Sequence, residues 1–299
     1  MKHLLSIEEL DHATMRHILD ASTPMKRERG NHARQPLAGQ TWSLIFSKSS
    51  TRTRVSFNVG IHELGGTGIF LNTSEMQLGR GEPVKDTARV LGRMTHGAVI
   101  RTYAQQDVVE FAQYSGIPTV NALTDEEHPC QILADIFTIE EKLGNIAGKT
   151  ITFVGDGDCN VARSWMFAAA RMNFELRIAA PKAFQPPQDF CQKAGGKVIC
   201  TENVADAARD ADVLYTDVWV SMGKEQESQD RLTQLQGYQV NQNLLKLAKP
   251  NALVMHCLPA YRGNEIDDAT FETNEKTIFD QAENRLHVQK AILDWMVSH

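Results

Sequence analysis

Phe46-Ser47-Lys48-Ser49-Ser50-Thr51-Arg52-Thr53-Arg54 is the stretch that indicates the fold, because it joins two segments of different pattern. The apolar, β-prone run Trp42 to Phe46 leads into it, and the helix-compatible run Val55 to Leu64 leads out. The first backbone N–H groups of a helix have no internal partner and attract anions. Hydroxyl groups add donors, and Arg52 can offer a planar guanidinium fork to a phosphate. The stretch therefore predicts an anion site, although an N-cap on an exposed basic turn would use the same residue types.

The composition is that of a soluble globular protein with room for two domains. The 299 residues are 42% hydrophobic and 23% charged, which is ordinary for a folded chain. The formal net charge is −6, so the overall charge does not indicate binding to nucleic acid or to an anionic membrane. An anionic substrate must therefore be held by a local basic cluster.

The five cysteines indicate a reducing compartment. Their number is odd and they form no CxxC pair, which argues against a disulfide framework and against a zinc knuckle. The segment Met1 to Leu10 has no sustained apolar region typical of a signal peptide, and no apolar run approaches membrane-spanning length. We therefore expect a cytoplasmic protein.

Apolar runs and helix-compatible segments alternate along the chain, which predicts parallel sheets covered by helices on both faces. A capping box at Ser6 and Glu9 predicts a helix that extends toward Leu19. Further helices are expected at residues 55–64, 83–94, 107–114, 129–143 and 284–297. Strands are expected at residues 42–46, 68–71, 98–101, 118–122, 150–154, 176–179, 197–200, 213–216, 252–256 and 277–279.

This pattern predicts an α/β protein with two doubly wound parallel-sheet domains joined by helices. A hinge at Gly144 to Lys149 would divide residues 1–144 from residues 145–283, with the C-terminal helix 284–299 packing back on the first domain. Ligands of such sheets bind at the carboxyl ends of the strands. Several polar residues follow predicted strands directly or within a short loop: Arg52, Arg101, His128, Asp156, Asp217 and Cys257.

The segment Thr150 to Asn160 invites a nucleotide-binding interpretation, because Gly155-Asp156-Gly157 follows a predicted strand. However, Asn160 occupies the place of the third glycine of the dinucleotide motif. The next strand also ends without an acidic residue that could hold a ribose. A nicotinamide cofactor is therefore disfavoured, and Asn160 could instead present its amide to a substrate carboxylate.

Two other junctions between a strand and a helix carry polar side chains. His128 precedes Gln131 by three residues, so both can face one small ligand, although a lone His there often only caps or packs. Asp217 opens the loop Asp217-Val218-Trp219-Val220-Ser221-Met222-Gly223. Its carboxylate would suit an ammonium group with Ser221 nearby, although it could also simply cap the next helix.

His256-Cys257-Leu258-Pro259-Ala260 follows another predicted strand, and its first two residues suggest either a nucleophilic thiol or a metal site. Adjacent residues on an extended segment point in opposite directions, and no further ligands with zinc spacing follow. The sequence therefore favours a buried thiol near a substrate, without a metal.

Taken together, the motifs resemble those of the aspartate/ornithine carbamoyltransferase family along the whole chain, and within it those of the ornithine branch. The matching segments are Ser50-Thr51-Arg52-Thr53-Arg54, Gln77-Leu78-Gly79-Arg80-Gly81-Glu82, Asp86-Thr87-Ala88-Arg89, His128-Pro129-Cys130-Gln131, the Asp217 loop, the His256 segment and Ala282-Glu283-Asn284-Arg285. The resemblance implies that carbamoyl phosphate and L-ornithine react to give L-citrulline and phosphate, with no metal and no cofactor.

The resemblance also implies roles for individual residues. The phosphate would be bound by Ser50, Thr51, Arg52, Thr53 and Arg101. The carbamoyl group would be held by His128, Gln131 and the Leu258 carbonyl, with Arg285 close by. Arg101 and His128 would then stabilise the oxyanion of the tetrahedral intermediate.

For ornithine, the resemblance implies that Asn160 and the Met222 backbone bind the α-carboxylate, while Asp217 and Ser221 bind the α-ammonium. Cys257 would lie near the attacking side-chain amine. The loop around Gln77 would reach the neighbouring subunit of a homotrimer, so that active sites are shared, and higher assemblies of trimers are compatible with this arrangement. A carbamoyltransferase that uses a different amine acceptor is the alternative.

Two positions depart from the family pattern. Asn58 stands where Glu is usual, which puts a local ion pair in doubt. Asp158-Cys159 replaces a more usual polar pair before Asn160, which puts details of the ornithine site in doubt.

Overall fold

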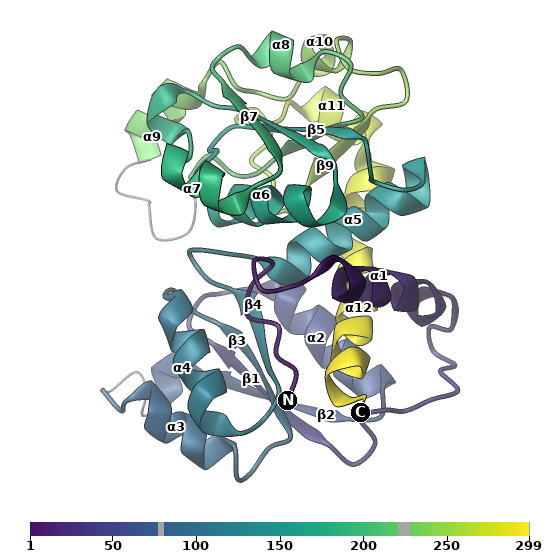
Figure 1. The fold of residues 1–299 in the computed structure, drawn as a ribbon, viewed down its shortest axis with the longest axis vertical. Coiled ribbons are helices and arrows are strands. Elements are labelled where there is room, and N and C mark those ends of the chain that lie inside the picture. The colour runs from purple at the N-terminus through teal and green to yellow at the C-terminus, as the bar shows by residue number, and fades with distance from the viewer. Residues whose placement is uncertain (77–80, 221–227, 299) are drawn as a thin grey trace. The chain divides into compact units, whose positions relative to one another are not determined.

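The structure is a computed structural model that describes residues 1–76, 81–220 and 228–298 (Figure 1). Its contacts divide the chain into two compact units. The first unit comprises Met1–Phe137 and Glu283–His299, and the second unit comprises Thr138–Ala282. The predicted hinge begins where helix α5 (Pro129–Leu143) ends, whereas this division falls inside the helix.

The first unit is built on a four-stranded sheet with the order β2-β1-β3-β4, and all its strand pairs are parallel. The strands are β1 (Thr41–Phe46), β2 (Thr67–Asn72), β3 (Gly97–Arg101) and β4 (Thr119–Leu123). The helices are α1 (His12–Arg27), α2 (Thr51–Glu63), α3 (Val84–Leu91), α4 (Gln105–Ser115), the start of α5, and most of α12 (Glu275–Val297). Figure 1 shows α3 and α4 on one face of this sheet and α1, α2 and α12 on the other.

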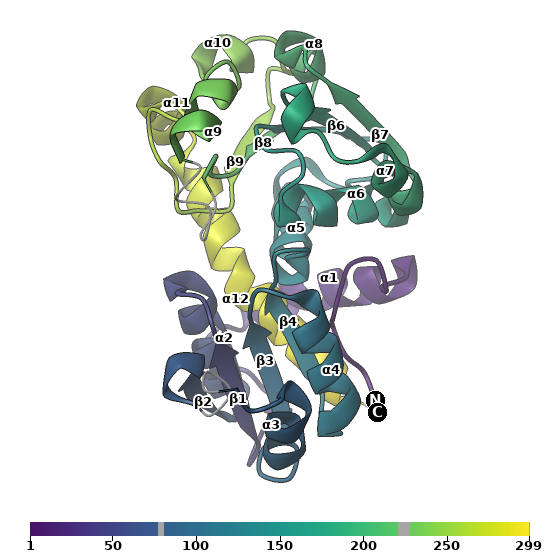
Figure 2. The same ribbon diagram turned by 90° about the vertical axis from the view of Figure 1, so that its left-hand side faces the viewer.

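The second unit contains a five-stranded sheet with the order β7-β6-β5-β8-β9, and these strands are also parallel. The strands are β5 (Thr150–Val154), β6 (Glu175–Ala179), β7 (Lys197–Thr201), β8 (Val213–Thr216) and β9 (Leu253–His256). The helices are α6 (Asn160–Met172), α7 (Gln188–Ala194), α8 (Val204–Ala208), α9 (Ser228–Leu235), α10 (Gln242–Leu245) and α11 (Asp268–Thr273). In Figure 2, α6 and α7 lie on one face of this sheet, with α8 and α10 on the other.

Both sheets confirm the predicted doubly wound architecture, because apolar side chains are buried against helices on either face. In the first unit, Ile45, Ile100 and Phe111 belong to a core that joins the sheet to α3 and α4. In the second unit, Val154 and Leu214 belong to a core that also includes residues of α8, α10 and α11. None of the helices in the described residues is both long and apolar enough to cross a membrane.

In each sheet the order in which the chain adds strands reverses once. The chain passes from β1 to β2 on one side and then places β3 on the other side of β1, so Phe46 pairs with Arg101 at the carboxyl ends. In the second sheet, β8 lies on the opposite side of β5 from β6, and Val154 pairs with Thr216. Loops that leave such neighbouring strands diverge to opposite faces and leave a crevice in which ligands bind.

The first predicted helix starts later than expected. The capping box was expected to open it at Ser6, but the helix begins at His12, and Asp11 caps it by accepting a hydrogen bond from the Thr14 N–H at 2.7 Å. The preceding segment is held in another way. Leu4 exchanges backbone hydrogen bonds with β4, and the Ile7 N–H donates to Glu127 Oε2 at 2.9 Å. Ser6 Oγ does accept the Glu9 N–H at 3.1 Å, but the turn that it caps ends before His12 and does not continue into α1.

The predicted strand at residues 277–279 is also wrong. Thr277 and Ile278 donate backbone hydrogen bonds to Asn274 O and belong to α12, one helix of 23 residues. Ile278 is fully buried while Phe279 is 52% exposed, as suits a helix that contacts the core on one side. Three β-prone residues are too few to distinguish a strand from a helical turn.

Candidate active site

The stretch from Phe46 to Arg54, named the anion loop here, joins a strand to a helix as predicted. Strand β1 ends at Phe46 and helix α2 begins at Thr51. Ser50 is the N-cap, and its Oγ accepts a hydrogen bond from the Thr53 N–H at 3.2 Å. Capping and anion binding are therefore both compatible with Ser50, because one hydroxyl can accept this bond and still donate its own proton. Thr51 is exposed, Arg52 is partly exposed and Thr53 is buried.

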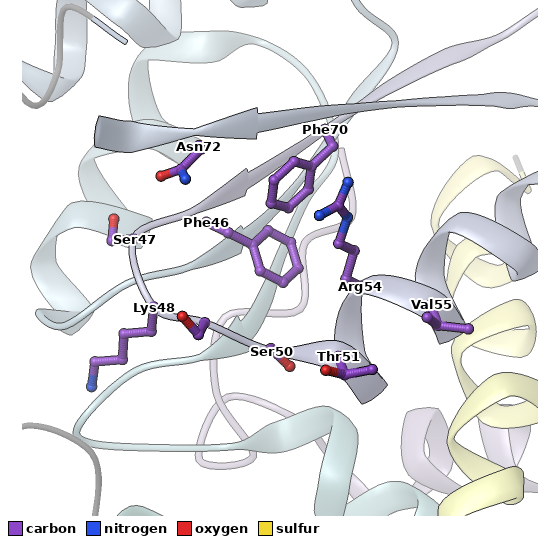
Figure 3. A pocket seen from close by; sticks show the side chains of 10 residues that line it. Phe46, Ser47, Lys48, Ser50, Thr51, Arg54, Val55, Phe70 and Asn72 are labelled. Carbon is purple, nitrogen blue, oxygen red and sulfur yellow. The ribbon is translucent and has the colours of Figure 1, made fainter. Parts of the chain in front are cut away.

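A hollow of about 490 Å³ opens beside this loop (Figure 3). Arg54, rather than Arg52, lines it, and the Arg54 guanidinium lies 3.6 Å from the centre of the Phe70 ring. Lys48 also lines it and was not among the predicted site residues, although it stands within the stretch that indicated the site. The full lining is Phe46, Ser47, Lys48, Ser49, Ser50, Thr51, Arg54, Val55, Phe70 and Asn72.

Lys48 is held in place by two interactions. Its ammonium forms an ion pair with Asp125 and lies 4.3 Å from the centre of the Tyr103 ring. Only 4% of its side chain is exposed, so the positive charge is desolvated at the edge of the anion loop. The Asp125 carboxylate offsets part of this charge, and the ammonium remains a fixed positive group beside the loop.

Arg101 ends β3 and lies beside the start of the anion loop. Its carbonyl accepts a hydrogen bond from the Ser47 N–H at 2.8 Å, and the residue is only 8% exposed. Arg101 therefore lies at the carboxyl end of β3, next to the end of β1 from which the loop with Ser50 leaves. This is the place where the strand order reverses and where ligands bind in such sheets.

Arg285 of α12 joins two other predicted residues. Its guanidinium donates to Gln131 Oε1 and, at 3.1 Å, to Thr53 Oγ1. The Gln131 amide nitrogen donates to Asp135 Oδ1 at 2.8 Å, so both ends of this amide are fixed. All of these side chains are buried. A residue from the end of the chain therefore fixes the anion helix α2 relative to the start of α5.

His128 precedes α5 and is 5% exposed. Burial, followed by the positive charges of Arg285 and Arg101, holds the pKa of His128 well below its usual value. Its imidazole is therefore neutral at pH 7 and can donate a hydrogen bond without carrying a charge. The structure thus brings Arg101, His128, Gln131, Arg285 and Thr53 into one electrostatic cluster of the first unit.

In the second unit, Asp217 follows β8 and Cys257 follows β9, and these are neighbouring strands. The Cys257 thiol donates to Asp217 Oδ1 at 2.9 Å, and the Val218 N–H donates to the same oxygen at 2.7 Å. Burial raises the pKa of Asp217, while His256 and these two hydrogen bonds oppose the rise. None of the helix caps in the described part of the chain is Asp217, whose carboxylate accepts the Val218 N–H. Residues 221–227 lie outside the described residues, so the capping alternative stays a prediction.

The His256 ring lies close to this pair but makes its hydrogen bonds to other groups. Its Nδ1 accepts a hydrogen bond from the Leu258 N–H at 2.8 Å, which leaves Nε2 to donate to Glu265 Oε1 at 3.0 Å. His256 and Glu265 are both fully buried. One ligand atom from each of Asp217, His256 and Cys257 lies within 4.8 Å of the others, but both ring nitrogens of His256 are already engaged. This set therefore does not form a ready metal site.

The segment after His256 has an unusual backbone. Leu258 has φ of 60°, a left-handed conformation that is strained for a branched side chain, and the Leu258–Pro259 bond is cis. Glu265 Oε1 also accepts a hydrogen bond from the Tyr261 N–H at 2.6 Å. The buried His256–Glu265 pair thus holds both ends of the Leu258 turn.

The glycine-rich segment after β5 holds other parts of the second unit in place through Asp156. Asp156 forms a buried ion pair with Arg231 of α9, and the Arg231 Nε–H donates to Trp219 O at 2.8 Å. Asp156 is therefore a structural residue that supports the segment after Asp217. Asn160, partly exposed, is the first residue of α6.

The two departures from the family pattern also have structural counterparts. Asp158 forms an ion pair with Arg163 at 2.9 Å, while the thiol of Cys159 is buried at the N-cap of α6. Asn58 is exposed and lies against Gly68, where any added Cβ would be 2.6 Å from Asn58 Oδ1. Gln77, Ser221 and Met222 lie outside the described residues.

Comparisons with known proteins agree with both units. Residues 2–141 match the family described as aspartate/ornithine carbamoyltransferase, carbamoyl-P binding domain, and residues 147–296 match its Asp/Orn binding domain. The chain therefore belongs to the aspartate/ornithine carbamoyltransferase family.

Its relatives include ornithine carbamoyltransferases. The one from Akkermansia muciniphila is 57% identical and aligns with 98% of this chain and 97% of its own length. The one from Methanoculleus marisnigri is 47% identical and aligns with 98% of this chain and 96% of its own. Among solved structures, ornithine carbamoyltransferase from Pyrococcus furiosus superposes with a TM-score of 0.92, at 41% identity, with 98% of this chain and 96% of that one covered.

Proposed function

We propose that this chain is an ornithine carbamoyltransferase, which transfers the carbamoyl group of carbamoyl phosphate to the side-chain amine of L-ornithine. The observation that carries the proposal is that each unit has its own cluster of polar residues at the ends of neighbouring strands. The first unit carries the anion loop with the Arg101, His128, Gln131 and Arg285 cluster, and the second carries Asp217 with Cys257. The relatives at 57% and 47% identity are both ornithine carbamoyltransferases.

The first unit takes carbamoyl phosphate. Its phosphate is bound by the N-terminus of α2, by the hydroxyl groups of Ser50, Thr51 and Thr53, and by the guanidinium groups of Arg52 and Arg101. The N-cap geometry of Ser50 supports this role, because it places the free N–H groups of the first turn at the loop. Lys48, fixed by Asp125, adds a positive charge at the same edge.

The carbamoyl group is held by His128, Gln131 and the Leu258 carbonyl, with Arg285 fixing the Gln131 amide. The ornithine amine attacks the carbamoyl carbon and forms a tetrahedral intermediate whose oxygen becomes negative. Arg101 and neutral His128 donate hydrogen bonds to that oxygen. The bond from carbon to the phosphate oxygen then breaks, phosphate leaves with the electron pair, and the nitrogen loses a proton, giving L-citrulline. The transfer balances without a redox partner.

The second unit takes L-ornithine. Asp217 and Ser221 bind the α-ammonium, Asn160 and the Met222 backbone bind the α-carboxylate, and Cys257 lies near the attacking amine. The hydrogen bond from the Cys257 thiol to Asp217 supports a shared site for these two residues. A bound ammonium would also favour the ionised form of Asp217, whose pKa burial raises.

One domain binds carbamoyl phosphate and comprises residues 1–144 together with the C-terminal helix 284–299. The other domain, residues 145–283, binds ornithine. The protein is cytoplasmic and forms a homotrimer in which the Gln77 loop completes the neighbouring subunit's site. Val55 and Ile69, which are 54% and 44% exposed on α2 and β2, support a subunit contact there. Exposed large apolar side chains are common at interaction surfaces.

A parallel assay tests the activity. Purified protein is incubated with carbamoyl phosphate and, separately, with L-ornithine, acetylornithine, putrescine or aspartate, and both phosphate release and carbamoylated product are measured. We expect citrulline from ornithine, with phosphate released in equal amount and only when ornithine is present. Product from another amine but not from ornithine would support the alternative acceptor, and no product at all would refute carbamoyl transfer.

A further inference from the structure

Two cysteines of the second unit face each other at a place that the proposed reaction does not use. Cys191 lies on α7 and Cys200 lies on β7, the outermost strand of the five-stranded sheet. Their sulfur atoms are 4.0 Å apart, and both residues are partly exposed. Small oxidants can therefore reach a pair of thiols that are already in contact.

The backbone keeps the two elements in this arrangement. Gly195 and Gly196 connect α7 to β7, and Gly196 has φ of +73°. A Cβ on Gly196 would lie 2.8 Å from the backbone nitrogen of Ala170, so this turn is pressed against α6. Cys200 is paired in register with Ile178 of β6, and the Gly195 N–H returns to the Cys191 carbonyl. The two thiols thus belong to a well-defined turn between a helix and a strand.

The surroundings of Cys191 add to this fit. Its sulfur lies 4.0 Å from Met166 Sδ on α6, and the neighbouring Phe190 packs edge-on against Phe167 with ring centres 5.3 Å apart. The Arg163 guanidinium lies 5.1 Å from the centre of the Phe190 ring. These contacts fix α7 on α6 while leaving the sulfur facing Cys200.

We infer that Cys191 and Cys200 are an oxidative modification site, where a peroxide converts the two thiols into a reversible disulfide between α7 and β7. The sulfurs must approach by about 2 Å to reach a disulfide bond length of about 2.05 Å. Rotation about the Cα–Cβ bond of a cysteine moves its sulfur by more than this. A disulfide framework is still not implied, because the pair is reduced in the structure.

The order of attack follows from the environment of each thiol. Burial raises the pKa of Cys191, and the hydrogen bond from Cys200 opposes that rise. Burial and, to a smaller extent, the neighbouring Cys191 raise the pKa of Cys200 to about 12. Cys191 is therefore the thiol that ionises first. Its thiolate attacks the peroxide and breaks the O–O bond, which gives a sulfenic acid and releases hydroxide.

Cys200 then attacks the sulfenic sulfur of Cys191, and the S–O bond breaks with loss of water. The sum is two thiols and one hydrogen peroxide giving one disulfide and two water molecules, so the peroxide is reduced and the thiols are oxidised. Because only the thiolate reacts, the raised pKa values make the reaction slow at neutral pH and faster as the pH rises. Each pH unit below the pKa should change the rate about tenfold.

Peptide mapping tests the site without relying on activity. The full-length protein is reduced, freed of reductant, exposed to hydrogen peroxide, alkylated and digested with trypsin. Lys193 and Lys197 separate the two cysteines, so the disulfide would join peptide 183–193 to peptide 198–209. We expect this linked pair, lighter by two hydrogen atoms than the two reduced peptides together, and its loss on treatment with a thiol reductant.

Matched variants distinguish the mechanism from general oxidation. Cys200→Ser should leave a sulfenic acid on Cys191 that a dimedone-type carbon nucleophile traps, whereas Cys191→Ser should give no such adduct at residue 200. The oxidised wild-type protein should unfold at a higher temperature than the reduced protein, and Cys200→Ser should lack this shift. The buried Cys130 should remain reduced throughout.

Three outcomes would overturn the inference. The linked peptides fail to form even at alkaline pH, although the partly exposed Cys257 is oxidised in the same sample. Cys191 pairs instead with another cysteine or with a second chain. The third is that peroxide oxidises Cys191 to a sulfenic acid at the same rate in the wild type and in Cys200→Ser, but the wild type forms no disulfide.

Discussion

At the scale of single residues, the molecule concentrates its charge chemistry in two places. The first is the positive cluster around Arg101, Arg285 and the neutral His128, where burial makes each charge more effective. The second is the Asp217–Cys257 pair, where burial works against the carboxylate. Burial thus strengthens the attraction of the positive cluster for an anion, and it disfavours the charged form of Asp217. A substrate group of opposite charge would stabilise each site.

Arg52→Ala should weaken binding of carbamoyl phosphate by about 2–5 kcal/mol, because it removes a charge-assisted contact from the phosphate site. Arg54→Ala is the matched comparison, since Arg54 is on the same helical turn and lines the hollow beside the loop. Calorimetric titration with carbamoyl phosphate measures both. If only Arg54→Ala weakens binding while Arg52→Ala remains folded with normal affinity, the phosphate contact belongs to Arg54.

Asp217→Asn should raise the KM for ornithine strongly and leave the affinity for carbamoyl phosphate almost unchanged. The neutral amide keeps an acceptor for the Val218 N–H and the Cys257 thiol, so the local structure can persist. The charge needed for the α-ammonium is lost. Steady-state kinetics with each substrate varied in turn measures the split. Equal losses for both substrates would show that Asp217 is structural.

The same variant should be more stable than the wild type at neutral pH. The folded-state pKa of Asp217 is raised, so folding favours its protonated form, and ionisation of the buried carboxyl costs stability above that pKa. The Asn variant escapes this cost. The difference should shrink as the pH falls through the raised pKa and vanish below the ordinary value of the unfolded chain. Urea unfolding at several pH values checks this, and an unchanged difference across the range would contradict it.

At the scale of elements, α1 and α2 both begin with a side-chain cap, but only the cap of α2 belongs to the proposed site. Asp11 caps α1 and Ser50 caps α2, each by accepting a bond from the backbone N–H three residues later. The geometry is therefore shared. What differs is the neighbourhood, because α2 follows a strand end at the point where the strand order reverses.

Asp11→Ala and Ser50→Ala should each lower the free energy of unfolding, because each removes an N-cap, and for the half-buried Ser50 the loss should be about 1 kcal/mol. Only Ser50→Ala should also raise the KM for carbamoyl phosphate, because of the two only Ser50 has a hydroxyl proposed to bind the phosphate. Denaturant unfolding and steady-state kinetics on the same preparations separate the two effects. If Ser50→Ala matches Asp11→Ala in both measurements, Ser50 serves as a cap alone.

At the scale of the whole molecule, the proposed trimer makes each active site a shared structure. In a cyclic trimer every subunit gives its Gln77 loop to one neighbour and receives a loop from the other. Two defects on different subunits can therefore meet in one site and leave another site intact.

Gln77→Ala and Arg52→Ala should each inactivate the enzyme, and mixing them should restore part of the activity. Random 1:1 mixing makes about three-quarters of the trimers mixed, each with one intact site of three, so about a quarter of all sites should recover. Citrulline formation is measured after the two variants are dissociated and reassociated together, with each variant alone as control. If mixed trimers form without regaining activity, the Gln77 loop serves its own subunit.

Much of the fold followed from local pattern. Helix 129–143 and strand 150–154 were predicted with the observed bounds, because their apolar periodicity and flanking turns act over a few residues. Two predictions were wrong, the start of the first helix and the strand at 277–279. In both segments the secondary structure depends on contacts with residues far away in the sequence. Leu4 pairs with β4, and Ile278 is buried in the core of the second unit, and neither contact leaves a signal in the neighbouring sequence.

The sequence by itself determined the class of the fold, the anion loop and the residues that follow each strand, since these depend on short-range pattern and residue chemistry. Only the tertiary structure decided that Arg285 joins Thr53 to Gln131, that Lys48 is fixed by Asp125, and that Asp156 supports a loop through Arg231. It also decided that Cys191 meets Cys200 and that His256 donates its hydrogen bond to Glu265. The physical reason is that long-range pairing and burial fix hydrogen-bond partners and pKa values, and both depend on which strands and helices become neighbours.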